Sequence, residues 1–180
     1  MRLDLFNNKE FDRGASKARE LFWLAVSGIC FSTWLPGSSW RVALLRCFGA
    51  KVGAGVVIKP RVVVKFPWKL SIGDYSWIGE RVWLDNLAPV SIGCHACISQ
   101  GVYLCTGSHD WSLSSFDLIT KPIEVADQTW LGAFSRVAPG VDVAQGAVLS
   151  MGSVATQPLE AWMVYSGHPA IAVRSRKEFA

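Results

Sequence analysis

The sequence predicts an all-β fold in which short strands wind into a parallel β-helix of about five triangular coils, preceded by α-helices and interrupted by one extruded loop. Two observations point to this fold class: aliphatic residues recur at every sixth position, and the six-residue beat restarts after 20 residues. The chain has 180 residues, of which 51% are hydrophobic and 18% charged. That composition excludes a disordered protein, and the length suits one domain with a buried core.

Charge and cysteine content narrow the function classes. The formal net charge is +4 and no block of like charges concentrates it, so the sequence carries no nucleic-acid-binding footprint. A basic groove for a phosphorylated small molecule stays open. Five cysteines are an odd number, which argues against a secreted disulfide framework and favours reduced thiols in the cytoplasm.

Residues 1–50 are expected to form a helical segment. Residues 21–40 carry no charge, but their densely apolar part, residues 21–35, is only 15 residues long, whereas a membrane-spanning helix needs about 20. A signal peptide fits poorly, because acidic residues precede this stretch and no small-residue cleavage site follows it. Two interpretations stay open: a helix that caps the core, and a helix that lies on a membrane surface. The second is favoured by the tryptophans Trp23, Trp34 and Trp40.

A second short helix is predicted over residues 38–48, after a break at Pro36. Ser38 or Ser39 can cap its start, because a side-chain oxygen there accepts a bond from an N–H of the first turn. Gly49 can end it.

The six-residue repeat predicts the coils. The residue four places after each aliphatic position is mostly small or β-branched, and it lies two places before the next aliphatic residue. Residues two apart on a strand share one face, so each unit is one short strand plus one corner, and three units make a coil. One coil cannot bury its face alone, so several must stack. The aliphatic positions are Val52, Ile58, Val64, Ile72, Ile78, Leu84, Ile92, Ile98, Leu104, Val125, Leu131, Val137, Val143 and Leu149.

The repeat breaks once. Ile92 and Val125 are 33 residues apart where 20 are expected, so 13 residues must leave the coils as a loop at about residues 110–122. A loop ejected from a rigid repeat is often functional. The expected organisation is therefore a β-helix domain over residues 51–160 and a carboxy-terminal tail over residues 161–180.

Several segments resemble the hexapeptide-repeat acyltransferases, and within them the colanic acid biosynthesis acetyltransferase branch, which is similar to the maltose, galactoside and nodulation O-acetyltransferases. The repeat that carries the resemblance covers residues 52–155. The matching segments are LDNLAPVSIG (84–93), ISQG (98–101), TGSHD (106–110), WLGA (130–133), PGV (139–141) and GHPA (167–170).

The resemblance implies a left-handed β-helix and an obligate homotrimer in which each active site lies between neighbouring prisms, with acetyl-CoA along the groove. It also implies an acetyl-CoA-dependent O-acetyltransferase that acts on a sugar hydroxyl in exopolysaccharide or cell-surface glycan biosynthesis. Outward-facing aromatic columns fit an interface or ligand surface, although the amino-terminal helices could cover them instead. One column holds Trp77, Cys97 and Trp130, and another holds Trp83 and Tyr103.

His109 is the candidate catalytic residue. The resemblance places a catalytic histidine in this motif, and a neutral imidazole, with an ordinary pKa near 6.5, can accept the proton of an attacking sugar hydroxyl. We expect direct transfer, because no side-chain nucleophile is well motivated. Asp110 and Asn86 are the candidate substrate-binding residues. Asn86 stacks beneath Thr106 in the 20-residue register, and its alternative interpretation is an asparagine that satisfies a corner.

The candidate cofactor-binding residues follow from the family's path for pantetheine. Trp130, Gly132 and Ala133 match the segment past which it is threaded, and Gly152 matches the small-residue step on the next coil. The 3′-phosphate needs cations at the end of the prism, for which the candidates are Arg174 and Arg176, helped by Lys177. Simple solvation or subunit packing is the alternative for this basic segment.

A metal site is not expected. Cys94 and Cys97 have a metal-like spacing, but no second such pair exists. The three histidines do not match the spacing in metal-dependent carbonic anhydrases, which share the prism. Two other function classes stay open: an acetyltransferase with an amino acid or antibiotic as acceptor, and a non-catalytic trimeric scaffold.

Overall fold

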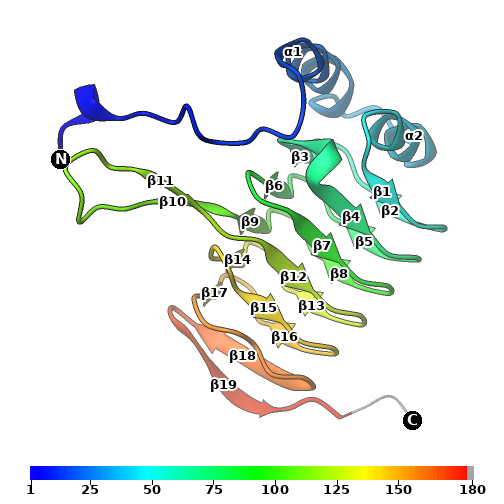
Figure 1. Ribbon diagram of the computed structural model, residues 1–180. Helices are drawn as coiled ribbons and strands as arrows, with labels where there is room; N and C mark the ends of the chain where they lie inside the picture. The colour runs from blue at the N-terminus through cyan, green and yellow to red at the C-terminus, as the bar shows by residue number, and fades with distance from the viewer. Residues whose placement is uncertain (178–180) are drawn as a thin grey trace.

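The computed structural model describes residues 1–177 and shows a triangular β-helix capped by helices at its amino-terminal end (Figure 1). Five coils each contribute one strand to each of three sheets, and within each sheet the strands of successive coils run parallel. The first sheet contains β1 (Lys51–Val52), β4 (Leu70–Ile72), β7 (Val90–Ile92), β12 (Ile123–Val125) and β15 (Asp142–Val143). The second contains β2 (Val57–Ile58), β5 (Trp77–Ile78), β8 (Cys97–Ile98), β13 (Trp130–Leu131), β16 (Val148–Leu149), β18 (Met163–Gly167) and β19 (Ala170–Ser175). The third contains β3 (Val63–Val64), β6 (Trp83–Asp85), β9 (Tyr103–Cys105), β14 (Arg136–Val137) and β17 (Val154–Ala155).

The core is the inward-facing column of aliphatic residues that the six-residue repeat predicts. In the second sheet the strands pair in register, so that Ile78 lies beside Ile98 and Ile98 beside Leu131, and all three are buried. Corners between coils leave little room. A Cβ at Gly73 would lie 2.6 Å from the backbone nitrogen of Cys94, so only glycine fits where these two coils stack.

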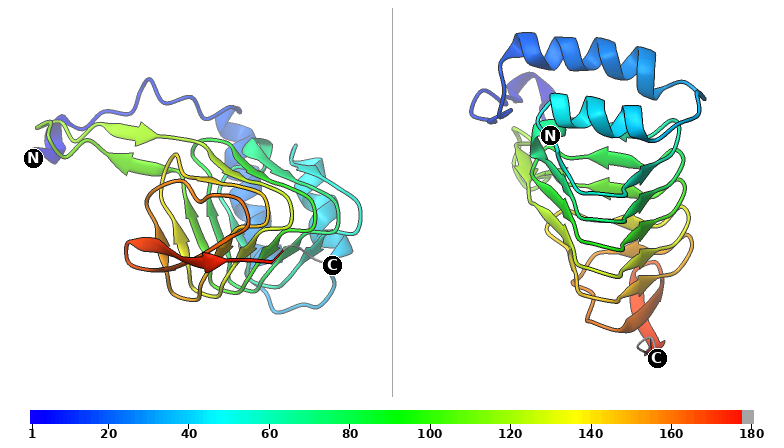
Figure 2. Two further views of the ribbon diagram at one scale, coloured as in Figure 1. Left: turned by 90° about the horizontal axis from the view of Figure 1, so that it is seen from below. Right: turned by 90° about the vertical axis from the view of Figure 1, so that its right-hand side faces the viewer.

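The amino-terminal helices cover the first coil, as the capping interpretation predicts. They are α1 (Lys17–Val26), its continuation η2 (Ser27–Phe31) and α2 (Ser39–Cys47), with the short turns η1 (Leu3–Leu5) and η3 (Pro67–Lys69) elsewhere. Trp23 and Phe31 are buried, and the Trp23 indole N–H donates to the Val64 carbonyl over 2.9 Å. Figure 2 shows α1 lying across the end of the prism, with the coils stacked beneath it. Within residues 1–177, no helix is long and apolar enough to cross a membrane.

Ser38 does not cap α2 through its side chain, contrary to one of the expectations. Its hydroxyl donates to the Val56 carbonyl over 3.2 Å and accepts from the Ile58 N–H over 2.7 Å. The side chain therefore ties the start of the helix to the first coil. Gly49 ends the helix with a positive φ of 96°, as the sequence predicts.

Two segments differ from the expected boundaries. The extruded loop begins earlier than residue 110, because β10 (Gly107–His109) already pairs with β11 (Leu118–Thr120) in an antiparallel hairpin that extends from the prism (Figure 1). Residues 163–175 are β18 and β19 and join the second sheet, so they are not a simple tail. Both differences arise from backbone pairing outside the six-residue repeat.

Candidate active site

His109 lies on β10, at the start of the extruded hairpin. The Phe116 carbonyl is 2.8 Å from its Nδ1 atom, and the two rings stack at 4.2 Å with an angle of 3° between their planes. A carbonyl oxygen can only accept, so Nδ1 carries the proton and Nε2 keeps its lone pair. The fold thus fixes the imidazole in the tautomer that a general base requires.

The amino-terminal residues hold the hairpin from outside. The Arg2 backbone N–H donates to the Ser114 carbonyl over 2.7 Å, and the Phe6 ring meets His109 edge-on at 5.5 Å. The amino-terminal segment runs beside β10 and β11 in both views of Figure 2. The histidine ring is therefore packed between Phe6 and Phe116, which restricts its rotation.

Asp110 faces the turn of the hairpin. Its carboxylate accepts from the backbone N–H of Ser112 over 2.9 Å and from the Ser112 hydroxyl over 2.5 Å. These bonds, the hydroxyl first, lower the pKa of Asp110 below its ordinary value. Asp110 shapes the loop that carries His109, while the Phe116 carbonyl orients the ring.

Asn86 is a corner residue. Its side chain is fully buried, its Oδ1 accepts from the Phe66 N–H over 2.9 Å, and its Nδ2 donates to the Phe66 carbonyl over 2.6 Å. The strand register places it beside Thr106, as predicted. Its amide is occupied by backbone and does not face a groove, which corrects the expectation that it contacts substrate.

A groove of about 900 Å³ runs along the second sheet and its corner with the third. The half-exposed Trp130 ring stands in it and donates its indole N–H to the Ser99 hydroxyl over 2.9 Å. The groove is mainly apolar, and cationic side chains line the end formed by β19 and the residues that follow it. Its lining residues include Ser99, Gln100, Trp130, Gly132, Ala133, Met151, Arg174, Arg176 and Lys177.

Two glycines lie in the stacked coils at the groove. A Cβ at Gly132 would lie 2.6 Å from the Met151 backbone nitrogen, so glycine lets the two coils stack there. A Cβ at Gly152 would meet nothing within 4 Å, and its N–H donates to the Ala133 carbonyl over 2.9 Å. Gly152 lies next to the lining residue Met151 and does not itself line the groove.

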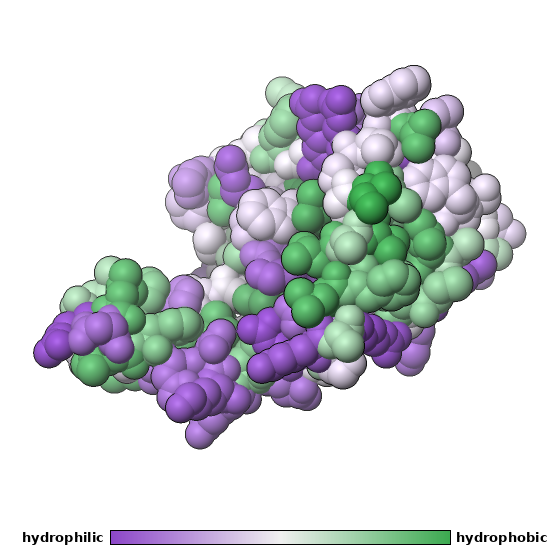
Figure 3. All heavy atoms as spheres, turned by 90° about the horizontal axis from the view of Figure 1, so that it is seen from above, coloured by the Kyte–Doolittle hydropathy of each residue, from purple (hydrophilic) through white to green (hydrophobic). Residues whose placement is uncertain are grey.

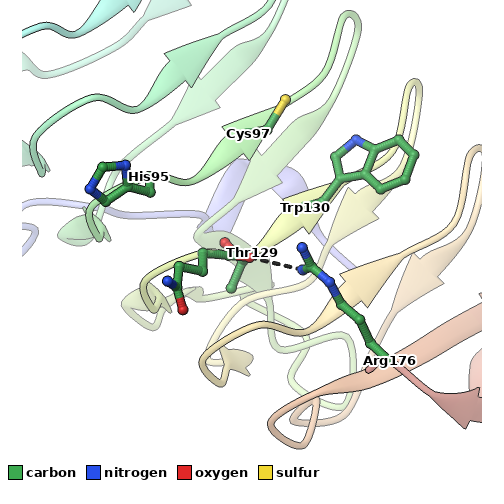
Figure 4. Close-up of a pocket in the computed structure, with 6 residues that line it drawn as sticks. His95, Cys97, Thr129, Trp130 and Arg176 are labelled. Atoms are coloured by element: carbon green, nitrogen blue, oxygen red, sulfur yellow. Dashed lines mark hydrogen bonds between the residues drawn. The ribbon is translucent and has the colours of Figure 1, made fainter. Parts of the chain in front are cut away.

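Arg176 lines both the groove and a second hollow of about 460 Å³ (Figure 4). Its guanidinium donates to the carbonyls of Gln128 and Gly146, each over 2.9 Å. In Figure 4 it reaches toward Thr129 beside the Trp130 ring, while His95 and Cys97 lie along the other side of the hollow. Among residues 1–177, no group of three or more histidine, cysteine, aspartate or glutamate side chains could hold a metal ion. We assign no role to His95, which stacks on Tyr75.

No family model matches the chain, but individual relatives do. The chain is 42% identical over 168 residues to the colanic acid biosynthesis acetyltransferase WcaF of Escherichia coli (strain K12). The matched region covers 92% of this chain and 92% of the relative. The chain belongs to the hexapeptide-repeat acetyltransferases, in the colanic acid biosynthesis branch. It is also 23% identical over 137 residues to the galactoside O-acetyltransferase of Escherichia coli (strain K12), covering 74% of this chain and 68% of the relative.

Solved structures agree with this assignment. A hexapeptide-repeat acetyltransferase from Vibrio cholerae O1 biovar eltor, in complex with acetyl coenzyme A, matches with a TM-score of 0.84 at 25% identity over 97% of each chain. A maltose O-acetyltransferase from Clostridium difficile 630 has the same fold, with a TM-score of 0.81 at 18% identity over 89% of this chain and 88% of that one. The left-handed β-helix class is confirmed, and the chain is an acetyl-CoA-dependent acetyltransferase.

A single chain of this acetyltransferase does not bring His109 to the groove. The hairpin leaves the prism between β9 and β12, at the corner of the third and first sheets. The groove lies on the second sheet and at its corner with the third. The histidine and the candidate cofactor-binding residues therefore lie at different corners of one prism.

Two features of the site escaped the sequence analysis. Phe116 orients His109 from across the hairpin, and no repeat position marks it. Ser99 and Gln100 line the groove, and here a signal exists: Ile98 pairs with Leu131, so the residues after each lie side by side. The same pairing confirms the predicted outward column of Trp77, Cys97 and Trp130.

Proposed function

We propose that this acetyltransferase transfers the acetyl group of acetyl-CoA to a sugar hydroxyl during exopolysaccharide or cell-surface glycan biosynthesis. The observation that carries the proposal is His109, whose Nδ1 is bonded to the Phe116 carbonyl and whose Nε2 is left to accept a proton. The sugar class is supported by the relatives named for colanic acid biosynthesis and for galactoside O-acetylation.

His109 acts as general base in direct transfer. Its Nε2 takes the proton of the sugar hydroxyl as that oxygen attacks the thioester carbonyl. The imidazolium then returns the proton to the departing CoA sulfur, and the acetyl ester and free CoA thiol are formed. The Phe116 carbonyl stabilises the imidazolium, because it accepts from Nδ1 throughout.

The groove holds acetyl-CoA. Its apolar walls at Trp130, Gly132 and Ala133, continued by the small step at Gly152, suit an extended pantetheine chain. Arg174, beside the anchored Arg176, supplies positive charge for the 3′-phosphate.

The active protein is a homotrimer in which His109 of one chain faces the groove of its neighbour. The support is their separation at different corners of one prism, together with the half-exposed aromatic rings of the outward columns. Trp83 and Tyr103 stack at 4.7 Å on the third sheet, which gives a rigid surface of the kind found at interfaces.

Thiol release from acetyl-CoA across a panel of sugars and nucleotide sugars tests the activity. We expect sugar-dependent release that falls by roughly 10²–10⁴ in His109→Ala, the usual contribution of a general base. His95→Ala is the matched control and keeps the wild-type rate. Equal release by wild type and His109→Ala would remove His109 as the base, and release with amino acids or antibiotics alone would contradict the sugar acceptor.

Co-expression tests the shared site. His109→Ala lacks the base, and Ala133→Trp fills the groove, so each is inactive alone. Random mixing in a trimer leaves about one site in four with both parts intact, so about a quarter of the wild-type rate should return. No recovery in mixed trimers would place both parts of the site in one chain.

A further inference from the structure

The helical end of the prism exposes a large apolar surface, which we call the apolar end. It consists of α1 and η2 side chains together with the two residues before the break at Pro36, and Figure 3 shows hydrophobic residues gathered on this face. Only Trp23 and Phe31 of these two helices are buried against the first coil. The exposed side chains and their exposed fractions are Leu21 66%, Phe22 64%, Leu24 66%, Ile29 72%, Trp34 73% and Leu35 50%.

Positive charge surrounds the apolar end. Residues 21–73 contain seven lysines and arginines and no aspartate or glutamate, whereas residues 74–180 contain six basic and ten acidic residues. Most of the basic side chains near the helices reach solvent, and we call these the basic collar. The basic collar consists of Lys17, Arg19, Arg46, Lys51, Lys59, Arg61 and Lys65.

Most of this charge is not neutralised locally. Among the ion pairs of the described residues, only Arg61 and Lys65 of the basic collar take part, at 3.7 Å with Glu80 and 3.4 Å with Asp85. The acidic Glu20 beside the apolar end is paired with Arg13 over 2.6 Å. The end therefore combines apolar side chains with a net positive rim.

The two features lie at matching depths. α1 lies across the end of the prism, and the first coil, which carries most of the basic collar, lies directly beneath it (Figure 2). A helix is about 10 Å across, and an interfacial helix sinks about 5–10 Å into the boundary between headgroups and acyl chains. Side chains one helix diameter behind the apolar end then meet the lipid phosphates.

We propose that the apolar end binds the surface of an anionic lipid bilayer, with the apolar side chains inserted and the basic collar against the headgroups. The 10 residues of α1 lie on the membrane and do not span it. End-to-end association with a second copy is the competing occupant, and the charge disfavours it, because two basic collars would face each other.

Vesicle flotation of the 180-residue chain tests the proposal. We expect binding to phosphatidylcholine vesicles with about 30% phosphatidylglycerol, weak binding to phosphatidylcholine alone, and release at high salt. The double variant Leu21→Glu/Ile29→Glu should bind the anionic vesicles at least about tenfold more weakly, because two inserted side chains become charged. Ile171→Glu, which changes a side chain that is 64% exposed at the other end of the chain, is the matched control and should bind as wild type.

A second variant separates charge from insertion. Lys51→Gln/Lys59→Gln should lower binding to the anionic vesicles by about fivefold for each charge removed and flatten the salt dependence. Thermal unfolding and acetyl-CoA binding establish that each variant is folded. Flotation requires no turnover, so the result stands apart from the proposed acetyl transfer. Wild-type protein that floats with neither vesicle, or glutamate variants that bind as wild type, would overturn the proposal. Sedimentation showing salt-resistant end-to-end pairing instead would assign the surface to a second copy.

Discussion

Replacing Asn86 with alanine measures how much the buried corner that it holds contributes to the free energy of unfolding. In the folded protein the Asn86 amide pairs with both the N–H and the carbonyl of Phe66, over 2.9 and 2.6 Å, and both residues are buried. Alanine leaves the Phe66 N–H without a partner and without access to water, whereas the Phe66 carbonyl keeps the bond from the Lys69 N–H over 2.9 Å. An unsatisfied buried donor costs about 1–3 kcal/mol and a lost hydrogen bond about 0.5–1.5 kcal/mol, so the free energy of unfolding should fall by roughly 1.5–4.5 kcal/mol. That is a large share of the roughly 5–15 kcal/mol that holds a domain folded.

Thermal unfolding at fixed protein concentration is the assay. For a chain of this size each kcal/mol shifts the midpoint by about 2–4 °C, so Asn86→Ala should unfold at least about 3 °C below wild type. Asn8→Ala, at an exposed position, is the control and should be unchanged. At a temperature where the variant stays folded, its KM for the proposed sugar acceptor should match that of wild type. An unchanged midpoint together with a raised sugar KM would refute the corner assignment and restore Asn86 as a substrate-binding residue.

Three further variants test the site and its scaffold. Gly132→Ala should lose about 1–3 kcal/mol of stability and bind acetyl-CoA more weakly in calorimetry, because its Cβ would meet Met151 backbone at 2.6 Å; Gly28→Ala, with open space around its Cβ, should lose nothing. Asp110→Ala should unfold at a lower temperature than wild type at neutral pH. A lowered pKa gives stability that is present above the ordinary value of 3.8 and lost as the pH falls through the depressed pKa. The difference in unfolding temperature between Asp110→Ala and wild type should therefore vanish in acid. A difference that persists in acid would contradict the stabilising role of the hydrogen bonds from Ser112 to the Asp110 carboxylate. Arg174→Ala should raise the KM for acetyl-CoA several-fold and leave the KM for dephospho-CoA thioesters unchanged, since a single exposed cation contributes about 1 kcal/mol; equal effects on both would exclude a contact with the 3′-phosphate.

The repeat made the fold predictable, because its period follows from how strands stack. Inward residues such as Ile78 and Ile98 must be apolar in every coil, so their spacing in the sequence reports the coil length directly. The same register predicts that Ser99 lies beside the groove residue Gly132. The candidate cofactor-binding residues gather in one groove for this reason, with Gly152 just outside it.

The rest of the site depends on contacts that no period marks. Phe116 reaches His109 across a hairpin whose strands pair with each other and not with the coils. Ser38 looks like a helix cap in sequence, but its hydroxyl bonds to the first coil. Asn86 is polar at a place where the sequence allows either a corner or a ligand contact, and only its burial decides between them.

The stacked coils also set regular distances along the axis of the prism. Neighbouring coils are spaced by about 4.8 Å, the separation of hydrogen-bonded strands. The hairpin that carries His109 follows the third coil, and the groove runs from the residues after β8 of that coil past the fourth and fifth coils to β18 and β19, while α1 lies across the first coil. The height of His109 above the helical end is therefore fixed in whole coils. Inserting or deleting one 20-residue coil before β7 would raise or lower His109 by a single step without altering a residue of the candidate site.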